Sequence, residues 1–290
     1  MGTKIKELNT YFFNGSIGEQ PPEGAERSVW KEIDEEDDII NTNESFDRWC
    51  AHTKPGEVLT AGEAKQVPAL TNGAIRMELM SSASGAAETS QCPEGWHEVR
   101  VIVDGERTIT TNGKNFTLKQ SNLLVLPAGQ SYEVSGDAPA IQLVVYGAKP
   151  FQLSKTYPDQ EIEGDLFLQP SAVVDKIPEG PAGGAHFELV ESQDINIETT
   201  FRSTDQGIYH RGFGQDEVHF QLKGSRATRT TQGEFPLAPG DFLLVPPGVS
   251  HRNVGDESTI RIVLYTRDPL NVSAEVASHT DRPEAAKTLA

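Results

Sequence analysis

The sequence has few cysteines, no long apolar run and no excess of positive charge, and each absence excludes a class of protein. The two cysteines in 290 residues, Cys50 and Cys92, are too few for a disulfide framework and lack zinc-binding spacing. No run approaches the roughly 18 to 20 apolar residues of a membrane helix, and the start MGTKIKELNTYFF lacks the pattern of a secretory signal. A net charge of −18 argues against nucleic acid and anionic membranes, which proteins bind mainly through Lys and Arg. We therefore expect a soluble, cytoplasmic protein with reduced thiols.

What the sequence does contain is an internal repeat. The stretch GERTITTNGKNFTLKQSNLLVLPAGQSYEVSGD, which begins at Gly105, aligns without a gap with GSRATRTTQGEFPLAPGDFLLVPPGVSHRNVGD, which begins at Gly224. The offset of 119 residues also places Tyr146 over Tyr265. The chain therefore carries two copies of one structural unit.

Both copies read as short strands. Runs such as EVRVIV, NLLVLP, AIQLVVY, EVHFQL, DFLLVP and IRIVLY are rich in β-branched residues and are separated by Gly, Pro and Asn-Gly turns. This pattern predicts an all-β fold, a sandwich or a barrel in each copy. The division that follows is an N-terminal extension (1–65, with an acidic helix over 28–41), a first domain (66–147), a linker (148–184), a second domain (185–270) and a frayed or disordered tail (271–290).

The second copy gathers polar groups on one face of a predicted strand. Alternation along EVHFQL directs Glu217, His219 and Gln221 to one side, and the apolar residues between them to the other. Three polar groups inside a small barrel are costly unless something uses them. The stretch PPGVSH supplies a tight turn that would deliver His251 onto a strand lining the same interior. With His210 added, the expected ligand set is His210, Glu217 and His251.

Two imidazoles and one carboxylate are the set expected of non-haem Fe(II) oxygenases. These residues also carry a family resemblance. In the first motif of the cupin superfamily, His210, Glu217 and Gly224 match, while Gly212 stands where a second histidine is usual. The second motif is matched at correct spacing, except that Asn253 arrives two residues early; its matching residues are Gly240, Pro246, Gly248 and His251.

The resemblance implies two tandem cupin domains, each a jelly-roll β-barrel, and a homodimer. Because one imidazole is missing at Gly212, the site resembles that of ring-cleaving enzymes such as homogentisate and 3-hydroxyanthranilate dioxygenases. It implies Fe(II), with Mn, Ni or Zn as alternatives, and a small aromatic or enolic substrate that reacts with O2. Two other functions stay open: a metal-dependent isomerase or lyase, and a small-molecule-binding protein without catalysis.

The first copy has lost most of this set. The 119-residue offset places Gln91 at the position of His210, Glu98 at Glu217, Arg100 at His219 and Tyr132 at His251. One carboxylate without an imidazole holds iron poorly. We therefore expect the metal site of the first domain to be degenerate.

The remaining polar groups of the second copy are assigned to the pocket. His219 lies two residues after Glu217, so it is expected to crowd the glutamate if it joins the same coordination sphere, and it is predicted to handle protons instead. Residues expected to contact the substrate are Gln221, Arg211, Arg202, Tyr209 and Phe213, with an arginine suited to a substrate carboxylate.

Overall fold

The computed structural model of the chain consists mainly of β-strands. It describes residues 48, 50–55, 59–60, 62–85, 87–120, 122–153, 166–168, 185–202, 215–230, 232–247, 249, 251–255 and 259–277. Within these residues no helix is long and apolar enough to cross a membrane. The predicted acidic helix over 28–41 lies outside them.

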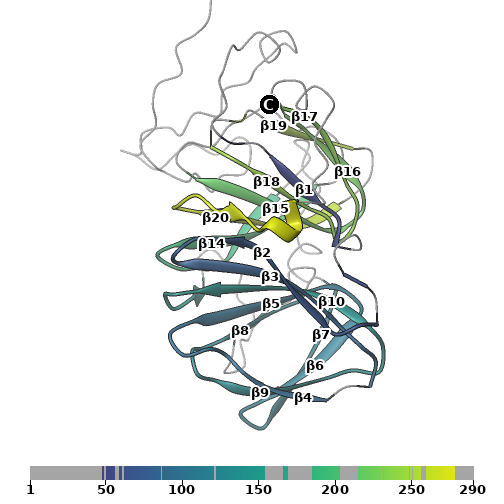
Figure 1. Ribbon diagram of the computed structural model, residues 1–290, viewed down its shortest axis with the longest axis vertical. Coiled ribbons are helices and arrows are strands. Elements are labelled where there is room, and N and C mark those ends of the chain that lie inside the picture. The colour runs from purple at the N-terminus through teal and green to yellow at the C-terminus, as the bar shows by residue number, and fades with distance from the viewer. Residues whose placement is uncertain are drawn as a thin grey trace, which may run out of the picture.

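The first half of the chain forms most of two sheets, shown in the lower part of Figure 1. The larger has seven strands in the order β12-β8-β5-β10-β3-β2-β21 and the smaller has four in the order β4-β9-β6-β7. Their bounds are β2 (Lys65–Thr71), β3 (Ile75–Ser82), β4 (Glu88–Gln91), β5 (His97–Asp104), β6 (Glu106–Thr111), β7 (Lys114–Lys119), β8 (Leu123–Leu126), β9 (Ser131–Ser135), β10 (Ala140–Gly147), β12 (Leu166–Leu168) and β21 (Asn271–Val272).

The second half repeats this arrangement. A seven-stranded sheet in the order β1-β18-β15-β20-β14-β13-β11 faces a three-stranded sheet in the order β17-β16-β19. The bounds are β1 (Ala51–Thr53), β11 (Gln152–Leu153), β13 (Ala185–Glu191), β14 (Ile195–Arg202), β15 (Asp216–Lys223), β16 (Arg226–Thr230), β17 (Gly233–Leu237), β18 (Phe242–Val245), β19 (His251–Val254) and β20 (Thr259–Thr266). The prediction of an all-β fold is confirmed, and each run singled out in the sequence lies on a strand.

The sheets cross the boundaries that the repeat suggested. Strand β1, from the predicted extension, pairs with β18, while β12, from the predicted linker, pairs with β8. Residues 271–277, expected to be a frayed tail, are ordered: β21 pairs with β2, and α4 (Ala274–Ala277) buries Val276. The Ser273 hydroxyl donates to the Pro68 carbonyl (2.6 Å) and ties this end to the first half.

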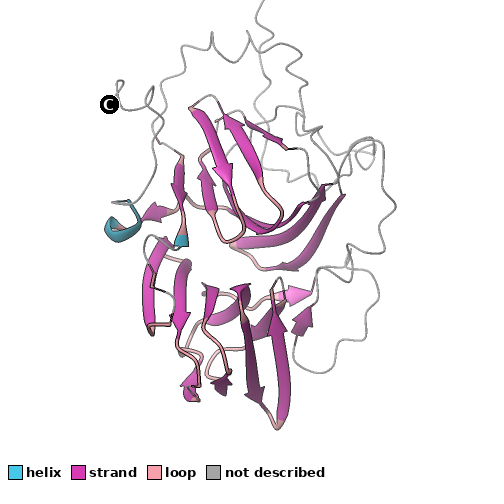
Figure 2. Cartoon of the chain, turned by 90° about the vertical axis from the view of Figure 1, so that its right-hand side faces the viewer, coloured by secondary structure: helices cyan, strands magenta, loops and turns pink. Residues whose placement is uncertain are grey.

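The main hydrophobic core lies between the two large sheets, which face each other in Figure 2. It takes alternate residues from both, including Val99 and Val101 on β5 and Val218 and Phe220 on β15. Because side chains alternate along a strand, the residues between these point into the space between the large and small sheet of the same half. The polar groups of the candidate site lie on that inner face.

Candidate metal centre

Three buried side chains meet inside the second half. Glu217 and His219 project from β15 and His251 projects from the start of β19. Their ligand atoms all lie within 4.8 Å of one another. The predicted alternation on β15 is confirmed, since Val218 and Phe220 belong to the core between the sheets.

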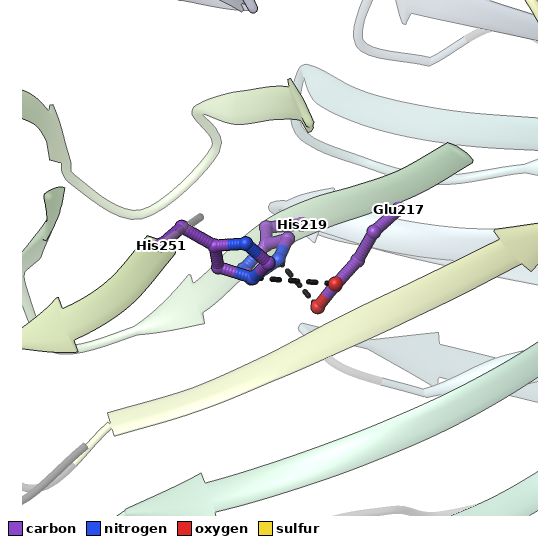
Figure 3. A group of neighbouring side chains, drawn as sticks. All are labelled: Glu217, His219 and His251. Atoms are coloured by element: carbon purple, nitrogen blue, oxygen red, sulfur yellow. Dashed lines mark ion pairs between the residues drawn. The ribbon is translucent and has the colours of Figure 1, made fainter. Parts of the chain in front are cut away.

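Both imidazoles approach the same carboxylate, as Figure 3 shows. His219 Nε2 lies 2.7 Å from Glu217 Oε1, and His251 Nε2 lies 3.2 Å from Glu217 Oε2. The two rings stand edge to face with centroids 5.4 Å apart. The His219 nitrogen, although close to the carboxylate, has no hydrogen-bond partner of normal geometry among the described residues. The ligand atoms of the three side chains therefore face a common volume between them.

The electrostatics favour an ionised carboxylate beside neutral imidazole. Burial alone would raise the pKa of Glu217, but His251 and His219 outweigh it and hold the pKa well below its ordinary value. Burial, reinforced by the nearby charge of Arg261, lowers the pKa of His219 from 6.5 to about 4. An ionised carboxylate and neutral imidazole are the protonation states that divalent metals require.

The turn before β19 positions His251. The Val249 amide donates to the Pro246 carbonyl (3.3 Å), which closes the turn, and His251 Nδ1 lies 3.3 Å from the Val249 carbonyl oxygen. A carbonyl on the second ring nitrogen is the usual way in which a metal-binding histidine is oriented.

Arg261 is a buried residue of the site that sequence reasoning missed. It lies on β20, is 2% exposed, and places Nη1 2.8 Å from His219 Nδ1. The same Nη1 donates to Asn253 Oδ1, which also accepts from the Thr228 hydroxyl (2.9 Å). The signal in the sequence was an arginine inside the apolar run IRIVLY.

Tyr265 and Glu198 add a second layer. The Tyr265 hydroxyl donates to Glu217 Oε1 at 3.4 Å. Burial, with Glu217 and Glu198 nearby, raises the pKa of Tyr265 well above its ordinary value, so the phenol stays protonated. Glu198 is fully buried on β14, and its Oε1 accepts from the Asn196 amide (3.2 Å).

No protein-family model matches the chain. It is 21% identical over 271 residues to quercetin 2,3-dioxygenase of Bacillus subtilis, covering 70% of this chain and 80% of that protein. A cupin 2 conserved barrel domain protein from Leptotrichia buccalis superposes with a TM-score of 0.57 at 12% identity, over 74% of this chain and 95% of that one. The chain has the cupin fold. A salicylate 1,2-dioxygenase variant from Pseudoaminobacter salicylatoxidans gives a TM-score of 0.56 at 12% identity, over 82% and 92% of the two chains.

The residues of this site fit a divalent metal. Glu217 is 7% exposed, both histidines are fully buried, and the three offer a hard carboxylate oxygen and two borderline imidazole nitrogens. The three side chains converge on a volume where a cation would offset the charge of a buried carboxylate.

Two neighbours of Glu217 had been assigned to the pocket. The ring of His219 lies beside Glu217 and His251 because the pleat directs residues 217 and 219 to the same face, and its role in handling protons stays a prediction. Gln221 was expected to contact substrate. Its side-chain amide instead donates to the carbonyls of Lys223 (2.8 Å) and Gly224 (2.9 Å), where a bulge interrupts the β15–β20 ladder.

Four other predicted site residues lie outside the residues that the structure describes: Tyr209, His210, Arg211 and Phe213. Arg202 ends β14, and its side chain is outside the described part too. Their roles stay predictions.

The equivalent place in the first half is filled differently. Arg100 Nε donates to Glu98 Oε1, its Nη1 to Gln142 Oε1 (3.1 Å), and its Nη2 to the Tyr132 hydroxyl (2.7 Å). The Tyr132 hydroxyl lies 3.2 Å from both oxygens of Glu98. A guanidinium therefore neutralises the carboxylate that remains.

Proposed function

We propose that this cupin is a non-haem Fe(II)-dependent dioxygenase that cleaves a small aromatic or enolic substrate with O2. The observation that carries the proposal is the buried cluster of one carboxylate and two imidazoles with ligand atoms within 4.8 Å. The similarity to quercetin 2,3-dioxygenase and the fold shared with salicylate 1,2-dioxygenase support it.

In the proposal, Glu217, His251 and His210 hold the metal. Glu217 and His251 come from the described cluster, and His210 comes from its place in the first cupin motif. The metal would supply Lewis acidity and open positions for two reactants; Mn, Ni or Zn fit the same donors.

The protein's own residues supply orientation and protons. Both imidazoles lie beside the Glu217 carboxylate, and the Tyr265 hydroxyl donates to its Oε1. His219 keeps a proton at the edge of the site. Tyr209, Arg211, Phe213 and Arg202 are proposed to contact the substrate, with the arginines available to a carboxylate or enolate oxygen.

Metal quantification combined with an oxygen-uptake screen tests this function. The purified protein should take up one Fe(II) per chain and consume O2 with catechols, aminophenols, hydroquinones or 1,3-diketones. His251→Ala should abolish metal uptake. Tyr132→Ala, the matched change at the equivalent position of the first half, should not; equal loss from both would contradict the assignment of the site to the second half.

Two outcomes would favour the alternatives. Turnover that is unchanged under strict anaerobiosis would indicate an isomerase or lyase in which the metal polarises the substrate. A protein that neither contains nor takes up metal would leave a small-molecule-binding role.

A further inference from the structure

The Nδ1 atoms of the two imidazoles face opposite kinds of hydrogen-bonding partner, an acceptor in the case of His251 and a donor in the case of His219. His251 Nδ1 lies 3.3 Å from the Val249 carbonyl oxygen. A carbonyl oxygen can only accept, so Nδ1 of His251 carries the hydrogen. In the neutral ring, Nε2 then presents a lone pair toward Glu217 and the volume between the three side chains.

His219 is in the reverse situation. Its Nδ1 lies 2.8 Å from Nη1 of Arg261, which is 2% exposed. A guanidinium donates and has no acceptor, so Nδ1 of His219 must present its lone pair to Arg261. In the neutral ring the hydrogen is therefore on Nε2, the atom that lies 2.7 Å from Glu217 Oε1.

We propose that the two histidines are held in opposite tautomers, and that this divides their roles. His251 is a metal ligand through Nε2, whereas His219 carries its hydrogen on Nε2, the atom that faces Glu217, and cannot be a third neutral ligand. Arg261 is the positioning residue that imposes this state. The ligand role of His251 rests on the proposed function; the tautomer of His219 does not.

Comparison of the two halves supports this division. In the first half, Arg100 on β5 contacts the carboxylate Glu98 directly, and Gln142 on β10 lies behind it. In the second half the guanidinium is on β20 instead, at the position equivalent to Gln142, and His219 lies between it and Glu217. Because the guanidinium of the second half is on β20, the strand next to β15, the Glu217 carboxylate is paired with a neutral imidazole and stays available to a metal.

Nitrogen NMR of the full-length apo protein with ¹⁵N-labelled histidine tests the tautomers directly. In a neutral imidazole, the protonated and unprotonated nitrogens have widely separated shifts. Near neutral pH we expect His219 to show an unprotonated Nδ1 and His251 an unprotonated Nε2. The signals of each ring are assigned by their disappearance in the variant that lacks it, His219→Gln or His251→Gln. An unprotonated Nε2 in His219 would overturn the proposal.

Variants of Arg261 test the cause. Arg261→Met removes the donor, so the Nε2-protonated form of His219 should lose its dominance. Arg261→Lys keeps a cationic donor and should restore it. If Arg261→Met leaves the His219 shifts unchanged, Arg261 does not set the tautomer.

Metal affinity separates ligand from donor without any assay of turnover. Gln at position 219 offers an acceptor to Arg261 and a donor to Glu217, so His219→Gln should change the Co(II) affinity by less than about tenfold, the low end for residues outside the coordination sphere. His251→Gln should weaken it by more than about 100-fold, beyond that range. A similar loss in both variants would make His219 a ligand and overturn the proposal. No Co(II) uptake by the unaltered protein would instead count against the proposed function, while leaving the NMR test intact.

Discussion

At the scale of single residues, each half buries a carboxylate at the equivalent strand position and gives it different partners. Glu98 is paired with Arg100 and Tyr132, while Glu217 is approached by two imidazoles and a tyrosine hydroxyl. A buried charge needs compensation in both cases, and the kind of compensation decides whether an external cation is needed.

Removing the internal cation of the first half should be costly. Arg100→Met leaves Glu98, which is fully buried, without its main partner, and we expect a loss of about 3–5 kcal/mol in the free energy of unfolding. Urea unfolding measures this loss. The double change Glu98→Met with Arg100→Met should recover much of it, because no uncompensated charge remains; a double variant as unstable as the single one would mean that packing, not charge, is responsible.

The apo protein should lose stability as the pH falls from about 6.5 to about 4. The pKa of His219 is lowered from 6.5 to about 4 by burial and by Arg261, so across this interval the unfolded chain binds a proton that the folded chain excludes. Urea unfolding over a pH series should show the decline. His219→Gln should flatten it, and an equal decline in that variant would assign the effect to other groups.

Much of the site could be predicted from the sequence at this scale, and the missing parts share a cause. The alternation on β15 and the turn before His251 are local, so spacing alone located Glu217 and His251. Arg261 was missed because its contact with His219 depends on the pairing of β15 with β20, which no local pattern specifies. Gln221 was assigned to the substrate for the same reason, because its hydrogen bonds to the Lys223 and Gly224 carbonyls depend on a bulge in the β15–β20 ladder.

At the scale of elements, the short strand β1 is fixed to the second half by more than its ladder with β18. Next to it, Arg48 pairs with both carboxylate oxygens of Asp216, the residue adjacent to Glu217, and donates to the Leu270 carbonyl. Gln232 accepts from the Cys50 amide (2.6 Å) and donates to the Arg48 carbonyl (2.8 Å). A segment far away in the sequence thus contacts the strand that carries the site.

Breaking this contact should destabilise the protein. Asp216 is fully buried and Arg48 is 31% exposed, so we expect Arg48→Met to cost about 1–3 kcal/mol, less than a fully buried pair. Arg229→Met is the matched control, because Arg229 and Glu234 form a surface pair at 2.7 Å with side chains 41% and 52% exposed. It should cost less than about 1 kcal/mol. Equal urea midpoints for the two variants would contradict the role given to Arg48.

At the scale of the whole molecule, the two large sheets share one hydrophobic core. Phe220 and Phe242 stack within the second sheet at 5.7 Å between ring centroids and face the first sheet. The halves related by the repeat should therefore unfold together rather than one after the other.

Phe220→Ala tests this coupling. Removing a ring that is 2% exposed should cost about 3–5 kcal/mol and lower the temperature of a single calorimetric transition. Two transitions, of which only one shifts, would show that the halves are independent.

The exchange of strands between the sheets has a consequence for how the protein is made. Strand β1 leaves the ribosome well before its partner β18, which lies far later in the chain. The first sheet must likewise wait for β21, beyond the end of the repeat. Pairings this distant in sequence form slowly. Neither sheet can be completed before its later strand has emerged, so the nascent chain must keep its exposed edges from associating wrongly until then.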